Sequence, residues 1–195
     1  MRSPVLPDEP KKRAQRLGAA LGFLDESGFT QRPPIRATWA PKGRTPVIRE
    51  PFNWKHLSGI GAVLTTTTGC RPRWLLALHP KAIRGPHVVR FLNALRRQVR
   101  RRVILLWDRL PAHRSRLVAH ALERHRHWLQ IAWLPAYAPE MNPLEYLWNH
   151  LDATALANTP PEDLRRLRRQ VHNGVQRIRR RPQIGRGFLR HTGLF

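Results

Sequence analysis

The chain has 195 residues, 41% of them hydrophobic and seven of them tryptophan, which is enough for one domain with a real core and too little for two domains. A net charge of +24, from 36 basic and 12 acidic residues, indicates a polyanionic partner: DNA, RNA or anionic lipid. Cys70 is the only cysteine, which excludes an intrachain disulfide, and no apolar run approaches the roughly 18 residues of a membrane span, so we expect a cytoplasmic protein.

The first half of the sequence predicts short strands and loops. Residues 1–16 are polar, basic and proline-containing, as is typical of an extension or linker. Five prolines in residues 30–52 predict loops there. Three strands are expected, over residues 21–24, 56–68 and 73–79.

In the second half, predicted strands alternate with helices. Strands are expected over 103–107 and 129–134, and helices from Pro86 onward and over 114–126, 143–155 and 161–180. The unbroken apolar run 103–107 indicates a strand that is covered on both faces. Leu117 falls on the buried stripe of its helix, and Trp107, Trp133 and Trp148 fall on predicted buried faces. The alternation predicts an α/β fold, with a mixed β-sheet of about five strands and helices packed on it.

Three of the scarce acidic residues occupy positions that suit catalysis. Asp25 and Asp108 each close an apolar strand, and strand ends are where functional side chains leave the core. With Asn142 as N-cap and Pro143 as first helical residue, Glu145 would be the third residue of a helix, at the border of its buried stripe. Carboxylates beside a basic surface suit Mg²⁺ or Mn²⁺, and a pair of such ions can activate a water or a 3′-hydroxyl and stabilise a leaving oxygen.

Each carboxylate also has a purely structural interpretation. Asp25 lies in Asp-Glu-Ser-Gly, which is an ordinary turn sequence, and Glu26 is a neighbouring candidate. Asp108 before Arg-Leu-Pro also suits a turn, and the pattern Asn-x-x-Glu that ends at Glu145 suits a capping box. Catalysis is favoured only by the three residues together, in this order and at this spacing.

Four segments then follow one another in a recognisable order: 24–28 (LDESG), 38–43 (TWAPKG), 107–115 (WDRLPAHRS) and 134–145 (LPAYAPEMNPLE). Together they resemble the DDE endonuclease domain of mariner-type transposases, in the bacterial insertion-sequence branch, over about residues 17–158. The resemblance implies an RNase H-like fold, with Asp25 and Asp108 on adjacent strands and Glu145 on a following helix. It also implies that these three bind two Mg²⁺ (or Mn²⁺) ions, for hydrolysis at insertion-sequence ends and strand transfer by a 3′-hydroxyl. The 36 residues between Asp108 and Glu145 are close to the family's spacing.

The resemblance also bears on domains and partners. It predicts an extension over 1–16, a catalytic domain over 17–158 and a basic helical segment over 159–195. Double-stranded DNA is the expected partner, with a homodimer in the DNA complex and a nucleoid-associated location in a bacterium. No helix-turn-helix module precedes the domain, which predicts a separate DNA-binding polypeptide from a split reading frame.

The sequence departs from the family pattern at two places. Arg109 stands where the family has asparagine, and residues 135–139 read Pro-Ala-Tyr-Ala-Pro instead of containing proline–tyrosine–serine–proline. A degenerate nucleic-acid-binding remnant is therefore one alternative function, and another RNase H-like nuclease is a second.

Basic residues on two predicted helices and at one helix start are candidates for DNA contacts. They are Arg96, Arg97, Arg100, His113, Arg114, Arg165, Arg168 and Arg169. The alternative for the last helix is a solvated charged face. His113 is also a candidate proton carrier or helix-start residue, and Trp39 is expected either to stack on bases or to anchor its loop.

Overall fold

The computed structural model describes residues 9–49, 55–108, 115–135 and 138–195. Five strands in these residues form one sheet in the order β3-β2-β1-β4-β5. The strands are β1 (Ala20–Thr30), β2 (His56–Thr65), β3 (Arg73–His79), β4 (Val103–Trp107) and β5 (Leu129–Trp133). β1, β2 and β3 pair antiparallel, whereas β4 pairs parallel with both β1 and β5. This arrangement confirms the predicted mixed sheet.

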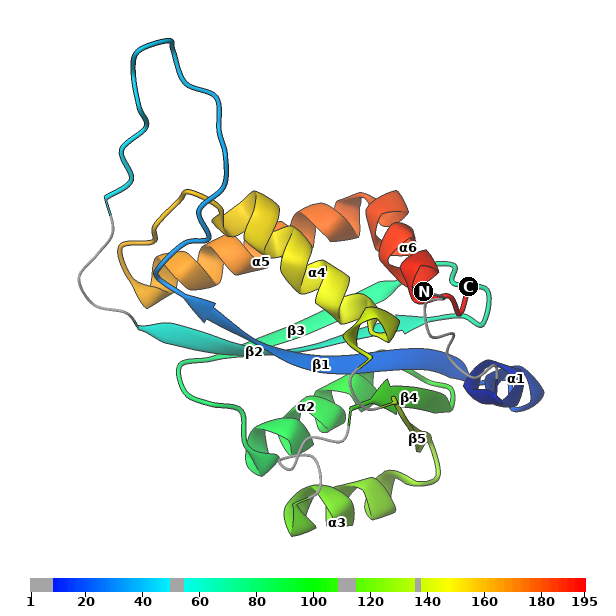
Figure 1. The fold of residues 1–195 in the computed structure, drawn as a ribbon. Coiled ribbons are helices and arrows are strands. Elements are labelled where there is room, and N and C mark those ends of the chain that lie inside the picture. The colour runs from blue at the N-terminus through cyan, green and yellow to red at the C-terminus, as the bar shows by residue number, and fades with distance from the viewer. Residues whose placement is uncertain (1–8, 50–54, 109–114, 136–137) are drawn as a thin grey trace.

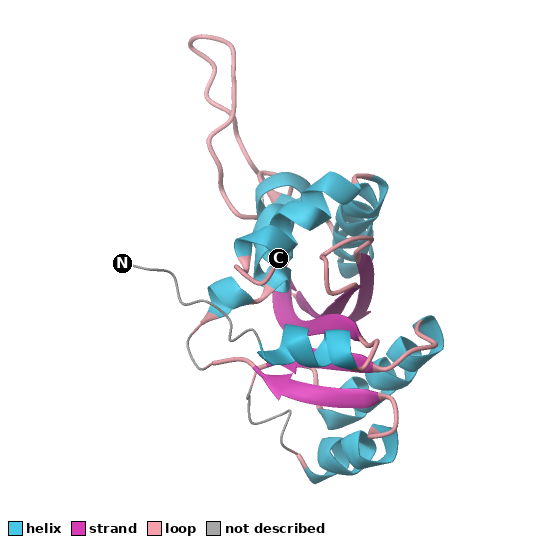
Figure 2. Ribbon diagram, turned by 90° about the vertical axis from the view of Figure 1, so that its right-hand side faces the viewer, coloured by secondary structure: helices cyan, strands magenta, loops and turns pink. Residues whose placement is uncertain are grey.

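The sheet separates two layers of helices (Figure 1). On one face lie α2 (Gly85–Gln98) and α3 (Arg116–His125), and on the other lie α4 (Pro143–Leu151), α5 (Leu164–Arg180) and α6 (Pro182–His191). Two short turns, η2 (Pro139–Met141) and η3 (Asp152–Leu156), flank α4. Figure 2 shows the sheet edge-on between these layers.

β4 has the double cover that its apolar sequence predicts. All five of its residues are buried. Ile104 and Leu106 pack into the core beneath α4 and α5, and Val103, Leu105 and Trp107 pack into the core beneath α2. Because successive side chains point to opposite faces of a strand, an unbroken apolar run supplies both cores.

β1 is longer than its apolar run suggests. The predicted strand end at Asp25 is wrong, because the strand continues to Thr30 and pairs with β2 as far as His56. Ladder hydrogen bonds to β2 and the burial of Phe29 stabilise this polar half of the strand. Asp25 therefore lies inside the strand.

Each end of the chain contains a helix whose bounds the sequence does not predict. Residues 9–16, inside the expected extension, form α1 (Glu9–Arg16), which buries Ala14 in the core. At the other end Pro182 begins α6 with its fixed φ, so the chain turns into a new helix rather than ending at α5. α5 and α6 bury side chains in the same core as α4.

Three side chains are more exposed than predicted. Trp133 is 39% exposed because β5 is an edge strand, although its ring stacks on Trp107 at 6.2 Å between centroids. Leu117 is 48% exposed, since Val118 and Ala121 form the inward face of α3. Trp39 is fully exposed on the loop between β1 and β2, so it does not anchor that loop. Trp107 and Trp148 are buried, as predicted.

Within the residues described, no helix has the length and apolar character needed to cross a bilayer.

Candidate active site

Asp25 and Asp108 lie at the same level of two neighbouring strands. β1 and β4 run parallel, and Phe23 pairs with Leu106 in their register. Asp25 comes two residues after Phe23, and Asp108 two residues after Leu106. Asp25 is 7% exposed inside β1, while Asp108 is half-buried just beyond the end of β4.

Glu145 is held near this level by the start of α4. Asn142 caps that helix, since its Oδ1 accepts a hydrogen bond from the Leu144 N–H at 3.2 Å. The same side chain donates from Nδ2 to the carbonyl oxygen of Leu24 at 3.3 Å. The N-terminus of α4 is thus fastened to β1 at the residue before Asp25, and Glu145 follows as the third residue of the helix.

The backbone at Asn142 weighs against the capping-box interpretation of Glu145. In a capping box, the side chain of the third helical residue accepts from the N–H of the N-cap residue. The Asn142 N–H instead donates to the carbonyl of Pro139 at 2.9 Å, which is part of η2. Glu145 is therefore not required to complete the cap.

Trp148, one helical turn after Glu145, contacts the first aspartate directly. Its indole N–H donates to Oδ2 of Asp25 at 2.9 Å. Gly61 of β2 pairs with Asp25, and a Cβ at this glycine would lie 2.7 Å from the indole ring, so only glycine leaves room for it. The sequence predicts Trp148 as a core residue but gives no signal for this hydrogen bond, because its partner lies on a strand far away in the chain.

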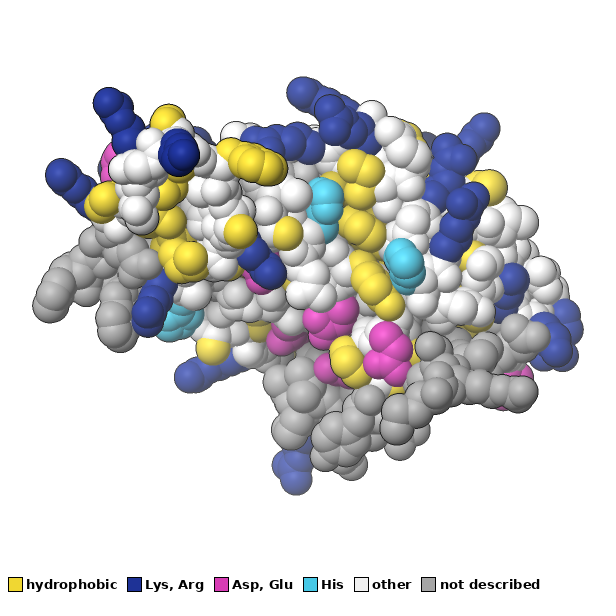
Figure 3. All heavy atoms as spheres, turned by 45° about the horizontal axis from the view of Figure 1, so that its top comes forward, with side chains coloured by type: hydrophobic (Ala, Val, Ile, Leu, Met, Phe, Trp, Pro, Cys, Tyr) yellow, Lys and Arg dark blue, Asp and Glu magenta, His cyan; other side chains and the backbone are white. Residues whose placement is uncertain are grey.

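The charges of the three carboxylates act on one another. Burial is the largest influence on Asp25 and raises its pKa from 3.8 to about 7; the Trp148 hydrogen bond opposes this, and the charges of Glu145 and Asp108 add to it. Burial, followed by the charge of Asp108, likewise raises the pKa of Glu145. Like charges that repel one another favour a bound cation. On the face shown in Figure 3, acidic side chains gather in one area, with Lys and Arg side chains spread around it.

A family model described as DDE superfamily endonuclease matches residues 20–168. The chain belongs to this family. Among curated proteins, none matches the chain.

Solved structures of mariner transposases share the fold of this DDE endonuclease. The Mos1 transposase paired-end complex with left transposon end has a TM-score of 0.57 and 18% identity, covering 94% of this chain and 59% of that chain. The Mos1 mariner paired end complex with Mn has a TM-score of 0.56 and 17% identity, covering 99% and 65%. The catalytic domain of Mos1 mariner transposase has a TM-score of 0.51 and 15% identity, covering 100% and 99%. The fold is therefore RNase H-like, and the chain spans about three fifths of the longer transposase chains.

Asp25, Asp108 and Glu145 have the oxygen donors that hard divalent cations prefer. In the described residues, no three His, Cys, Asp or Glu side chains are close enough to surround a single metal ion. Mg²⁺, however, is commonly held by only one or two carboxylates, with water and substrate phosphate completing its shell. Three carboxylates whose charges interact in pairs suit two such ions bound together with DNA.

The candidate DNA-contacting residues of the DDE endonuclease fall into separate groups. Arg96 lies over the Trp128 ring at 5.3 Å, Arg165 pairs with exposed Asp163 at 3.2 Å, and Arg168 donates to the Leu78 carbonyl at 3.0 Å. The side chains of Arg97, Arg100 and Arg169 are exposed. His113 and Arg114 lie outside the described residues.

The raised pKa of Asp25 predicts how the stability of the metal-free DDE endonuclease changes with pH. The pKa of Asp25 in the folded protein, about 7, exceeds its ordinary value of 3.8. The contribution of Asp25 to the free energy of unfolding is therefore fully present below pH 3.8 and is lost as pH rises through about 7. We expect Asp25→Asn, which cannot ionise, to equal the wild type near pH 4 and to exceed it by up to about 4 kcal/mol near pH 8. Thermal unfolding in EDTA across this range measures the difference, and a constant difference would contradict the prediction.

Proposed function

We propose that this chain is the catalytic part of a cut-and-paste DNA transposase. It would hydrolyse phosphodiester bonds at insertion-sequence ends, and the freed 3′-hydroxyl would then attack a phosphodiester bond of target DNA, forming a new phosphodiester as the 3′-oxygen of the target strand leaves. The observation that carries the proposal is the arrangement of Asp25, Asp108 and Glu145 in a DDE superfamily domain: the register of β1 and β4 puts the two aspartates at the same level, and the Asn142 side chain ties the start of α4 to Leu24. A net charge of +24 supports double-stranded DNA as the substrate.

In this proposal Asp25, Asp108 and Glu145 are the catalytic residues and the ligands of two Mg²⁺ or Mn²⁺ ions. Such ions, when bound, activate the attacking water or hydroxyl and neutralise charge on the leaving oxygen. The protein contributes the positions of the ligands. Trp148 fixes one oxygen of Asp25, and Asn142 fixes the start of α4 against β1 at the residue before Asp25, so that Glu145 is held near Asp25 before DNA arrives.

The partners are also proposed. We infer a homodimer in the DNA complex, because the similar Mos1 structures include paired-end complexes. We also propose that a separate polypeptide recognises the terminal repeats, and that the protein acts at the bacterial nucleoid.

Plasmid cleavage tests the proposed activity. Supercoiled plasmid should be nicked by the wild-type protein in Mg²⁺ or Mn²⁺ and left intact in EDTA, while Asp108→Asn should be inactive. Glu162→Gln, which removes an exposed carboxylate elsewhere, is the matched control and should cleave like the wild type.

Three outcomes would overturn the proposal. Equal nicking by wild type and Asp108→Asn, or DNA binding without cleavage, would support the binding-only remnant. Cleavage confined to RNA–DNA hybrids would instead support another RNase H-like nuclease.

A further inference from the structure

Four arginines surround a hollow on the face of the sheet opposite the carboxylates. The hollow measures about 540 Å³ and is lined by Arg73, Arg97, Gln98, Val99, Arg100 and Arg101. Arg73 begins β3, Arg97 and Gln98 end α2, and the other three residues lead into β4. No acidic residue lines it.

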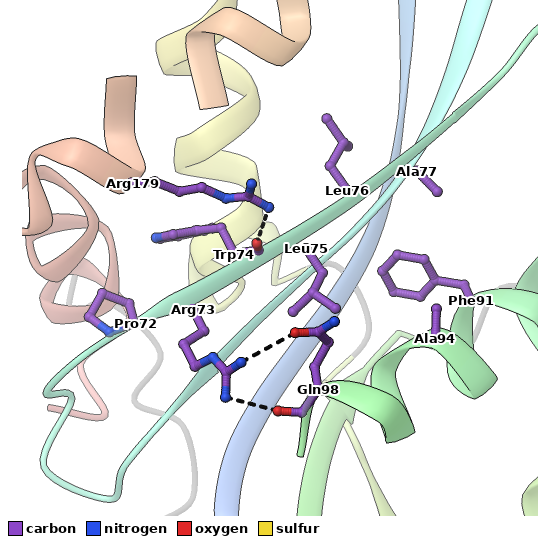
Figure 4. A pocket seen from close by; sticks show the side chains of 10 residues that line it. All are labelled: Pro72, Arg73, Trp74, Leu75, Leu76, Ala77, Phe91, Ala94, Gln98 and Arg179. Atoms are coloured by element: carbon purple, nitrogen blue, oxygen red, sulfur yellow. Dashed lines mark hydrogen bonds between the residues drawn. The ribbon is translucent and has the colours of Figure 1, made fainter. Parts of the chain in front are cut away.

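One guanidinium is held in place by the end of α2. Arg73 donates from Nη1 to the Gln98 carbonyl at 2.8 Å and from Nη2 to Gln98 Oε1 at 3.2 Å, as Figure 4 shows. Within the described residues, none of the four arginines of the hollow forms an ion pair with an acidic side chain. Three exposed guanidiniums thus gather around a fixed fourth one.

Stabilisation of α2 explains only part of this cluster. Cations near the C-terminus of a helix interact favourably with its dipole, which accounts for Arg96 and Arg97 in the last turn. Arg100 and Arg101 follow the helix, and Arg73 comes from another element. Bringing like charges together costs free energy, and that cost is offset when a polyanion binds.

A second hollow extends the first along the edge of the sheet. It measures about 550 Å³, shares Arg73 and Gln98 with the first, and runs along the outer edge of β3 (Figure 4). It is lined in part by Leu75 and Leu76, and Arg179, which donates to the Trp74 carbonyl, lies on its far side. One further basic group therefore lies along this edge.

The arginine hollow and the carboxylates lie on opposite faces of the sheet. β3 and β4 run parallel, and the pairs Arg73–Leu64, Leu64–Gly22 and Gly22–Leu105 place Arg73 level with the middle of β4, whereas Arg101 precedes β4 and Asp108 follows it. Three strand residues, about 10 Å, therefore separate the level of Arg73 from that of Asp108, and two strand spacings separate β3 from β1 by about 10 Å. The Asp25 side chain faces α4, whereas Arg97 belongs to α2 on the opposite face. DNA bound over the carboxylates and DNA held by the arginines would therefore contact different faces of the sheet.

We propose that the arginine hollow binds the phosphodiester backbone of a second DNA segment while another segment occupies the active site. The inference rests on the proposed function only in requiring DNA as the partner. Recognition would be independent of sequence, since guanidiniums contact phosphates and not base edges.

Binding measurements test this without any cleavage. In wild-type protein, short duplexes of about one helical turn, roughly 10 base pairs, should saturate at two per chain. The variant Arg97→Gln/Arg100→Gln/Arg101→Gln should bind one duplex per chain at the same salt concentration. Arg73 is left intact because it fastens β3 to α2. The matched control Arg16→Gln/Arg186→Gln/Arg190→Gln removes the same charge from other exposed positions and should keep two duplexes.

Equal losses in both triple variants would show a general charge effect and overturn the proposal. So would unchanged duplex binding by the hollow variant. If the hollow variant loses binding only to vesicles of equal parts phosphatidylcholine and phosphatidylserine, the site belongs to lipid headgroups and the proposal is overturned. The binding measurements are made without metal and do not depend on cleavage. A protein that binds two duplexes but does not cleave DNA would therefore refute the proposed function and leave this inference standing.

Discussion

Glu145→Gln is expected to reduce metal-dependent plasmid cleavage by at least about 100-fold, the loss typical of removing one charged group from a preorganised site. The amide removes a cation ligand with almost no change of shape. The third position of the helix accepts glutamine, and the cap itself is made by Asn142 and Leu144. Removing a half-buried charge whose pKa is raised by burial and by Asp108 relieves repulsion in the metal-free protein. We therefore expect its unfolding free energy to stay within about 0.5 kcal/mol of the wild type or to rise.

Cleavage assays paired with thermal unfolding in EDTA give both quantities. Glu123→Gln is the control, because Glu123 forms only an exposed ion pair with Arg126 and should affect neither activity nor stability. A Glu145→Gln protein that cleaves normally but unfolds more easily would return Glu145 to the role of a helix cap.

The parts of this site that the sequence predicts are the ones fixed by local chemistry. The continuous apolar run of β4 places Asp108 at a strand end, because only a strand covered on both faces uses such a run. Asn142 and Pro143 fix the start of α4 through short-range capping, and with it the helical position of Glu145. None of these features depends on a distant partner.

The features that the sequence misses depend on pairing between distant segments. The polar half of β1 reads as a turn, and only its ladder with β2 makes it a strand and moves Asp25 into the interior. The sequence predicts that Trp133 is buried, but the side chain is exposed because β5 lies at the edge of the sheet. The hydrogen bond from Trp148 to Asp25 and the space left by Gly61 exist only after α4 packs on the sheet.

That hydrogen bond leads to the second large expected effect. Trp148→Phe keeps an aromatic ring near Phe29, whose centroid lies 5.8 Å from that of the indole, but removes the N–H donor to Asp25. The donor lowers the pKa of Asp25, so without it that pKa should rise above about 7. At neutral pH fewer molecules then carry the ionised ligand that a cation needs. We expect cleavage near pH 7 to fall about tenfold for each pH unit by which the profile moves, and to recover at higher pH.

A role limited to packing would behave differently. Trp128→Phe is the matched control, because Trp128 is equally buried, lies in the core beneath α2, and its indole N–H has no partner among the described residues. Trp128→Phe should lower the unfolding temperature without moving the pH profile of cleavage.

In Trp148→Phe the loss of unfolding free energy should instead be larger above pH 7, at about 1–3 kcal/mol for an unpaired buried carboxylate. The loss should shrink in the Asp25→Asn background, where no carboxylate remains to be paired. An unshifted profile with an undiminished loss in that background would mean that Trp148 only fills space, and the orientation of Asp25 would then depend on β1 and β2 alone.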